Sequence, residues 1–252
     1  MYTIYSLTDE IPAGDNYSLF KYMDFPKFMS LISMGKLHFT RIDKFDECFK
    51  ENEPGKVLKA LQKTTGGGYH LPDFVEESKK CCISCWTQTS IESYPLWEAY
   101  GRSAYSLAIQ SDVSHIQNSI LHHTPSAPIQ TITMNTRCGK VNYFDKFVEA
   151  PPENCQFFFY KPCQFEDEKE YRFLINGDRL SVCNTVSSYF ENSTVLLPSI
   201  DIPINPKELI KHIYVSYHAS EWFYELIKSI VIKYELVNES NIDDLLTWSV
   251  LK

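Results

Sequence analysis

Hydrophobic and polar residues change their spacing several times along this chain, which predicts short strands mixed with a few helices. The alternation over residues 37–41 is typical of a strand, because successive side chains of a strand point to opposite faces. Residues 17–22 predict an earlier strand. Between the two, Asp24 as N-cap, Pro26 in the first turn and Gly35 as the stop predict a helix. The chain therefore opens as strand, helix, strand.

The rest of the chain continues this irregular mixture. Further strands are predicted over residues 81–88, 104–110, 140–144, 168–175, 194–197 and 213–216, and helices over residues 56–63, 94–101, 113–121 and 220–234. Strands outnumber helices without a regular alternation of the two, which favours an α+β fold with a mixed, mostly antiparallel sheet and flanking helices. No linker is visible, so we predict a single domain over residues 1–252.

Composition narrows the class of protein. Hydrophobic residues make up 44% and aromatic residues 14% of the chain, which predicts a packed core rather than disorder. The net charge of −8 argues against duplex DNA as the main partner, because neutralising phosphates needs a surplus of Lys and Arg. We find no basic, apolar leader and no run of about 18 apolar residues, and therefore expect a cytoplasmic protein without a membrane partner.

Sequence motifs of common cofactor and metal sites are missing. The glycine-rich dinucleotide and P-loop motifs, the zincin motif and the nucleophile-elbow motif are all absent. Cys82 and Cys85 have the spacing of a zinc-binding pair, but no second pair follows, and a strand would turn the two thiols to opposite faces. We therefore predict no metal site and expect most of the 8 cysteines to be buried thiols.

The stretch with the clearest chemical character is Glu168-Lys-Glu170-Tyr-Arg172. If a strand begins at Glu168, its period of two places both carboxylates and Arg172 on one face. Two carboxylates about 7 Å apart can then act together, one as a general base or charge stabiliser and one to orient it. The alternative is an exposed acidic strand face with an ordinary salt bridge to Arg172. Nearby, Lys161 is either a phosphate contact or a solvated side chain.

Several short motifs occur in a fixed order along the chain. They are Leu19-Phe-Lys-Tyr22, residues 37–47, Ser84-Cys-Trp86, residues 107–111, residues 139–143 and Phe165-x-x-Glu168-x-Glu170-x-Arg172. This succession, over about residues 19–225, resembles the bacterial domain-of-unknown-function 2971 family. Some members of that family are linked to phage defence, so the resemblance implies a bacterial protein with a role in defence.

A more distant resemblance concerns mechanism. Lys21-Tyr22, the helix predicted before Gly35, Phe39-Thr40-Arg41 and Glu168-Lys-Glu170 follow one another in the order of the corresponding parts of ADP-ribosyltransferases. The first-strand position carries Lys21 where that superfamily usually has His or Arg, and Phe39-Thr40-Arg41 stands in place of Ser-Thr-Ser.

The second resemblance implies roles for individual residues. Lys21, Tyr22, Thr40 and Arg41 would bind NAD, with Tyr22 stacking on nicotinamide. Glu170 would stabilise the cationic ribose as nicotinamide leaves, and Glu168 would orient or deprotonate an acceptor. The alternatives are a noncatalytic binding or sensor module and, third, a hydrolase or nuclease that uses the carboxylates with Mg²⁺. Trp86, Trp97 and Tyr100 either line a ligand groove or pack in the core.

Overall fold

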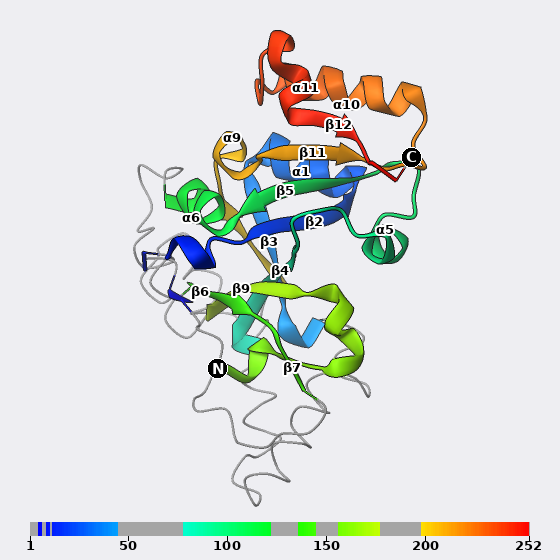
Figure 1. The fold of residues 1–252 in the computed structure, drawn as a ribbon. Helices are drawn as coiled ribbons and strands as arrows, with labels where there is room; N and C mark the ends of the chain where they lie inside the picture. The colour runs from blue at the N-terminus through cyan, green and yellow to red at the C-terminus, as the bar shows by residue number, and fades with distance from the viewer. Residues whose placement is uncertain are drawn as a thin grey trace, which may run out of the picture. The chain divides into compact units, whose positions relative to one another are not determined.

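The computed structural model describes residues 5–6, 9–10, 12–44, 78–121, 136–144, 156–176 and 198–251, with helices and a mixed, mostly antiparallel sheet (Figure 1). The predicted α+β class is confirmed. The helix predicted over residues 56–63 and the strand over residues 194–197 lie outside the described residues.

Contacts between Cα atoms divide the chain into two compact units. The first unit comprises Met1–Asp9, His38–Cys85 and Ser126–Asp201, and the second comprises Glu10–Leu37, Trp86–Pro125 and Ile202–Lys252. Each unit is therefore assembled from three separated stretches of the chain. The expectation of a single domain stays a prediction.

The first unit contains strands that are distant in sequence. In sheet order they are β1 (Tyr5–Ser6), β6 (Thr136–Lys140), β9 (Glu170–Asn176) and the first part of β4 (Cys81–Gln88), while β3 (Lys36–Arg41) pairs with β4 and with β10 (Ser199–Pro203). The short strands β7 (Asn142–Phe144) and β8 (Tyr160–Pro162) form a separate parallel pair. The 3-10 helices among its described residues are η2 (Ile42–Lys44), η3 (Gln156–Phe159) and η4 (Cys163–Glu168). Segment 156–176 thus supplies two strands and two 3-10 helices.

In the second unit, four strands follow the end of β4 in the order β2 (Ser18–Asp24), β5 (Ser106–Asp112), β11 (His212–Val215) and β12 (Leu246–Trp248). The helices are α1 (Phe25–Met34), α5 (Tyr94–Tyr100), α6 (Val113–Leu121), α9 (Pro206–Leu209), α10 (Glu221–Lys233) and α11 (Ile242–Leu245), with 3-10 turns η1 (Ala13–Asp15) and η6 (Glu239–Asn241). Helices α6 and α9 lie at one end of the strands and α5 at the other (Figure 1).

Helix α1 forms where the local signals predict it. The Asp24 side chain accepts a hydrogen bond from the amide of Lys27 (2.9 Å), and Pro26 stands in the first turn. Gly35 ends the helix in the left-handed region (φ 59°), where its amide donates to the Leu31 carbonyl. The predicted N-cap and stop are confirmed.

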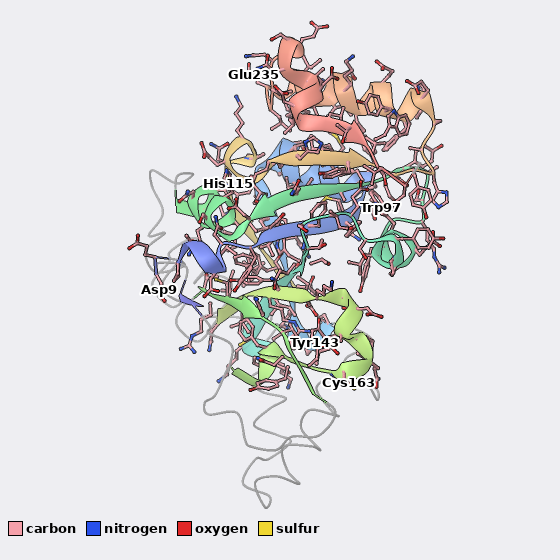
Figure 2. All side chains as sticks on the ribbon, viewed as in Figure 1. Asp9, Trp97, His115, Tyr143, Cys163 and Glu235 are labelled. Carbon is pink, nitrogen blue, oxygen red and sulfur yellow. The ribbon has the colours of Figure 1, made fainter. Side chains whose placement is uncertain are left out.

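The aromatic residues of α5 and β4 separate into core and surface. Trp86 and Trp97 are buried, which confirms the core alternative for both, whereas Tyr100 is 56% exposed. The indole of Trp97, at α5 in Figure 2, donates to the carboxylate of Glu92 (2.8 Å). A Cβ at Gly101 would collide with the Trp97 ring, so this turn requires glycine.

Within the described part of the chain, no helix is both long enough and apolar enough to cross a bilayer.

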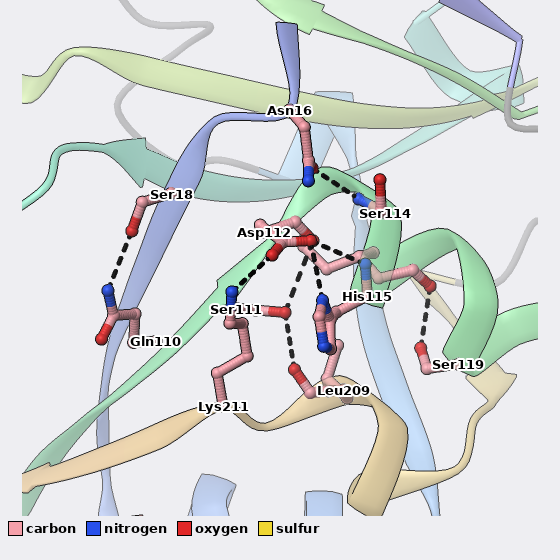
Figure 3. Close-up of polar contacts among 11 residues, drawn as sticks. Asn16, Ser18, Gln110, Ser111, Asp112, Ser114, His115, Ser119, Leu209 and Lys211 are labelled. Carbon is pink, nitrogen blue, oxygen red and sulfur yellow. Dashed lines mark hydrogen bonds and ion pairs between the residues drawn. The ribbon is translucent and has the colours of Figure 1, made fainter. Parts of the chain in front are cut away.

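A polar cluster fixes the end of β5 in the second unit (Figure 3). The buried carboxylate of Asp112 accepts hydrogen bonds from Lys211 Nζ (2.7 Å) and from the His115 amide (2.8 Å), and the His115 Nδ1 lies 2.9 Å away. Burial alone would raise the pKa of Asp112, but Lys211 and His115 outweigh it and lower the pKa below its ordinary value. The ionised carboxylate thereby caps α6 and ties it to the residue before β11.

We expect Asp112→Asn to lower the free energy of unfolding by about 1–3 kcal/mol at neutral pH, because Lys211 and His115 lose a charged acceptor. The pKa of Asp112 is lower in the folded protein than in the unfolded chain. The stabilisation of the fold by its carboxylate is therefore complete above the ordinary pKa of 3.8 and is lost as the pH falls through the folded-state pKa. The free energy of unfolding, measured by urea denaturation at a series of pH values, should therefore fall less steeply with decreasing pH in the variant than in the wild type. The matched control is Asp243→Asn at an exposed carboxylate of α11. An equal acid-side slope in wild type and Asp112→Asn would contradict this role.

Candidate functional site

The acidic motif does not form a single strand face. Strand β9 begins at Glu170, whereas Glu168 ends η4, and Lys169 between them adopts the left-handed conformation (φ 45°). The prediction that Glu168, Glu170 and Arg172 share one face of a strand is therefore wrong for Glu168. The turn at Lys169 interrupts the period of two on which the prediction depended.

Glu170 and Arg172 do share a face, and they form a two-point ion pair. Arg172 Nε donates to Glu170 Oε1 (2.8 Å) and Arg172 Nη2 donates to Glu170 Oε2 (3.0 Å). Arg172 Nη1 also donates to the Phe158 carbonyl (2.6 Å). The alternative of a salt bridge to Arg172 is confirmed, but its exposed setting is wrong, because the Glu170 side chain is only 6% exposed.

Lys161 joins the two carboxylates. Its Nζ lies 2.6 Å from Glu168 Oε2 and 3.3 Å from Glu170 Oε2, and it also lies 4.7 Å from the centre of the Phe165 ring. The Lys161 side chain is 9% exposed, so the alternative of a solvated lysine is wrong. Below, Lys161, Glu168, Glu170 and Arg172 are called the charge cluster.

Backbone pairing explains why Lys161 reaches Glu170. In the parallel pair of β7 and β8, Tyr143 stands opposite Lys161. The hydroxyl of Tyr143, labelled in Figure 2, accepts a hydrogen bond from the Glu170 amide (2.8 Å). The amide of Val141 donates to the Glu170 carbonyl (2.9 Å). Both backbone polar groups of Glu170 are thereby satisfied by the segment that runs into β7.

The charge cluster keeps Glu170 ionised. Burial would raise the pKa of Glu170, but the positive charges of Arg172 and Lys161, with hydrogen bonds from Arg172 and from the half-buried thiol of Cys85, lower it to about 2. Burial raises the pKa of Tyr143, so its hydroxyl stays protonated at neutral pH. The site thus contains a buried, fixed negative charge at Glu170 with two cations beside it, and one of these cations, Lys161, also pairs with the more exposed Glu168.

Two of the residues predicted to bind NAD, Lys21 and Tyr22, lie on β2 in the second unit. The Lys21 ammonium lies 5.2 Å from the centre of the Trp86 ring, a cation–π contact. The Tyr22 hydroxyl accepts a hydrogen bond from the Ser93 amide (2.8 Å), and burial raises its pKa to about 12. As neighbours on a strand, the two side chains project from opposite faces.

The other two residues predicted to bind NAD, Thr40 and Arg41, lie on β3 in the first unit. Thr40 pairs with Ile83 of β4. The guanidinium of Arg41 is buried and makes a two-point ion pair with Asp43, through Nε to Oδ1 and through Nη2 to Oδ2 (2.9 Å). The structure therefore gathers Glu168, Glu170 and Arg172 into the charge cluster and places the four predicted NAD-binding residues on β2 and β3.

Among the described residues, no group of three or more His, Cys, Asp or Glu side chains is arranged to hold a metal ion. Burial raises the pKa of the Cys82 thiol to about 12, which disfavours the thiolate that a metal would need. Cys82 therefore packs as a buried thiol.

Sequence reasoning missed the positions of Lys161 and Tyr143. Lys161 stands four residues after Phe157 in an aromatic run, and nothing local marks it as the partner of two carboxylates. Its role follows from the parallel pairing of β7 with β8, which a single sequence does not reveal.

Comparison of the chain with protein-family models, with curated proteins and with solved structures finds no match. The two resemblances read from the motifs therefore stay predictions.

Replacing Glu170 by Gln should strongly destabilise the protein, because it leaves Arg172 and Lys161 as buried cations without their shared counter-charge. We expect a loss of about 3–5 kcal/mol in the free energy of unfolding, measured by urea denaturation. The control is Glu166→Gln, which removes an exposed carboxylate from η4 and should change the stability by less than about 0.5 kcal/mol. Equal stabilities of the two variants would show that Glu170 is not a buried ion-pair member.

Proposed function

We propose that this chain is an ADP-ribosyltransferase-like, NAD-using transferase that acts as a bacterial defence or toxin-type effector. The observation that carries the proposal is the Glu170 carboxylate, which is buried, ionised and oriented by two hydrogen bonds from Arg172. A fixed negative charge in a site of low dielectric stabilises a positive charge that develops during a reaction. The order of Lys21-Tyr22, Thr40-Arg41 and Glu168-Lys-Glu170 along the chain supports the same class.

The chemistry that this class requires fits the charge cluster. NAD supplies an N-glycosidic bond between ribose and a cationic nicotinamide ring, and the electron pair of that bond leaves with nicotinamide. Glu170 would face the positive charge left on the ribose. Glu168, which is 24% exposed and therefore within reach of solvent, would accept the proton of the acceptor as the new bond to ribose forms.

The four NAD-binding candidates have the side chains that a dinucleotide needs, namely two cations for phosphates, an aromatic ring and a hydroxyl. In the described residues, Arg41 is paired with Asp43, Lys21 lies over Trp86, and the Tyr22 hydroxyl is bound to Ser93. Binding of NAD at any one of these side chains would therefore replace the contact described for it.

A noncatalytic binding or sensor module in phage defence is the second candidate, and one observation favours it. Both oxygens of Glu170 already accept hydrogen bonds from Arg172, and Oε2 also contacts Lys161. A structural ion pair satisfies a carboxylate in this way without any reaction.

Titration of NAD into the wild-type protein by calorimetry, with nicotinamide release followed in parallel, tests the proposal. We expect binding and release in the wild type, and a fall in the rate of about a hundredfold or more in Glu170→Gln, because the fixed negative charge is lost. Circular dichroism should establish that each variant is folded.

Glu168→Gln is the second informative variant, since its side chain is the more exposed of the two carboxylates. It should retain NAD binding and lose transfer to the acceptor. Asp167→Asn, at an exposed neighbour in η4, is the control that should keep both. Absence of NAD binding at millimolar concentration would reject the transferase and leave the noncatalytic module.

A further inference from the structure

The hydroxyl of Tyr143 lies beside the charge cluster and is fixed to the first residue of β9. It accepts a hydrogen bond from the Glu170 amide (2.8 Å), and the pairing of β7 with β8 puts Tyr143 opposite Lys161. On the same segment, the amide of Val141 donates to the Glu170 carbonyl (2.9 Å). The hydroxyl is therefore held at a defined position next to the residue whose carboxylate is buried.

This hydroxyl has a second hydrogen-bonding capacity, because a phenol oxygen can accept one hydrogen bond and donate another. Burial outweighs the opposing effect of the hydrogen bond from the Glu170 amide and raises the pKa of Tyr143, so the proton stays on the oxygen at neutral pH. Among the residues that the structure describes, no group accepts this proton, and the Tyr143 side chain is only half-buried. The proton is therefore available to a hydrogen-bond acceptor that comes from solvent.

We infer that Tyr143 is a ligand-binding residue whose hydroxyl donates a hydrogen bond to a hydroxyl oxygen of the nicotinamide ribose of NAD. This inference rests on the proposed function, in which Glu170 faces that ribose. A donor whose oxygen is already held in place loses little freedom when a ligand binds, so it is preorganised for one acceptor.

The charges around Tyr143 indicate the chemistry of that acceptor. The carboxylates of Glu170 and Glu168 and the ammonium of Lys161 act on the hydroxyl electrostatically, so negative charge predominates there. This setting favours a neutral acceptor over a phosphate. A sugar hydroxyl fits, because it can accept a hydrogen bond from Tyr143 while it donates one to a carboxylate.

Calorimetric titration of NAD and the kinetics of nicotinamide release, compared between wild type and Tyr143→Phe, test this inference. The variant should bind NAD about two- to tenfold more weakly, because one hydrogen bond between neutral groups is lost. KM should rise by a larger factor than kcat falls, since this contact forms with the bound substrate and persists in the transition state. A fall in kcat at unchanged affinity would overturn the inference, because Tyr143 would then act only through the position of Glu170.

Fluorotyrosine in place of Tyr143 separates the two roles of the hydroxyl and preserves a test if Tyr143→Phe does not fold. Because fluorine withdraws electrons from the ring, the hydroxyl becomes a stronger donor and a weaker acceptor. The donor role predicts that NAD binds about twofold more tightly than in the wild type, while the weaker bond from the Glu170 amide lowers the free energy of unfolding. Affinity equal to or weaker than that of the wild type would contradict the donor role.

Tyr105→Phe is the control, because it removes the hydroxyl of a tyrosine in the second unit that is 53% exposed. Its affinity for NAD should stay within about a factor of two of the wild type. Nicotinamide release by the wild type, with equal affinity for NAD in all Tyr143 variants, would reject the role of Tyr143 and retain the transferase. Absence of NAD binding by the wild type itself would reject the transferase, and the role of Tyr143 with it.

Discussion

An ionised carboxylate buried at the first residue of a strand, Glu170, sets the conditions for the structure around it. Burial disfavours its charge, so cations must be buried with it. Arg172 provides one because the period of two in β9 returns it to the same face. Lys161 provides the other from β8, where its register with Tyr143 is fixed by the pairing with β7. Residues 156–176 therefore supply both cations that compensate the buried charge of Glu170.

Stability alone does not explain this arrangement. Replacing a buried ion pair by apolar side chains of similar volume is often neutral or stabilising. Four charged groups at one place therefore stabilise a core no better than apolar side chains would. What the ions add is a fixed field and a fixed geometry. Arg172 holds both oxygens of Glu170, and the carboxylate keeps its charge at any physiological pH. Those are the properties required of a group that faces a transient cation or organises the binding of a charged ligand.

The parts of the fold that the sequence predicts well depend on neighbouring residues. Helix α1 is an example, since Asp24, Pro26 and Gly35 act on the backbone within a few positions of themselves. The part that failed depends on a contact at longer range. The alternation from residue 168 is regular, yet Lys169 turns the chain and Glu168 pairs with Lys161. Local periodicity identified Glu170 and Arg172 correctly as neighbours on one face, but it contained no information on β8.

The same limit applies to the residues predicted to bind NAD, which the sequence places in order but not in contact. In the structure Arg41 is paired with Asp43, Lys21 lies over Trp86, and Glu168 is paired with Lys161. A ligand that uses such cations must replace an internal partner by one of its own. When a phosphate takes the place of a carboxylate, the buried cation stays paired, and the exchange avoids the large penalty of an isolated charge. The free energy of such an exchange is the difference between two similar ion pairs, which is much smaller than the cost of burying a cation alone.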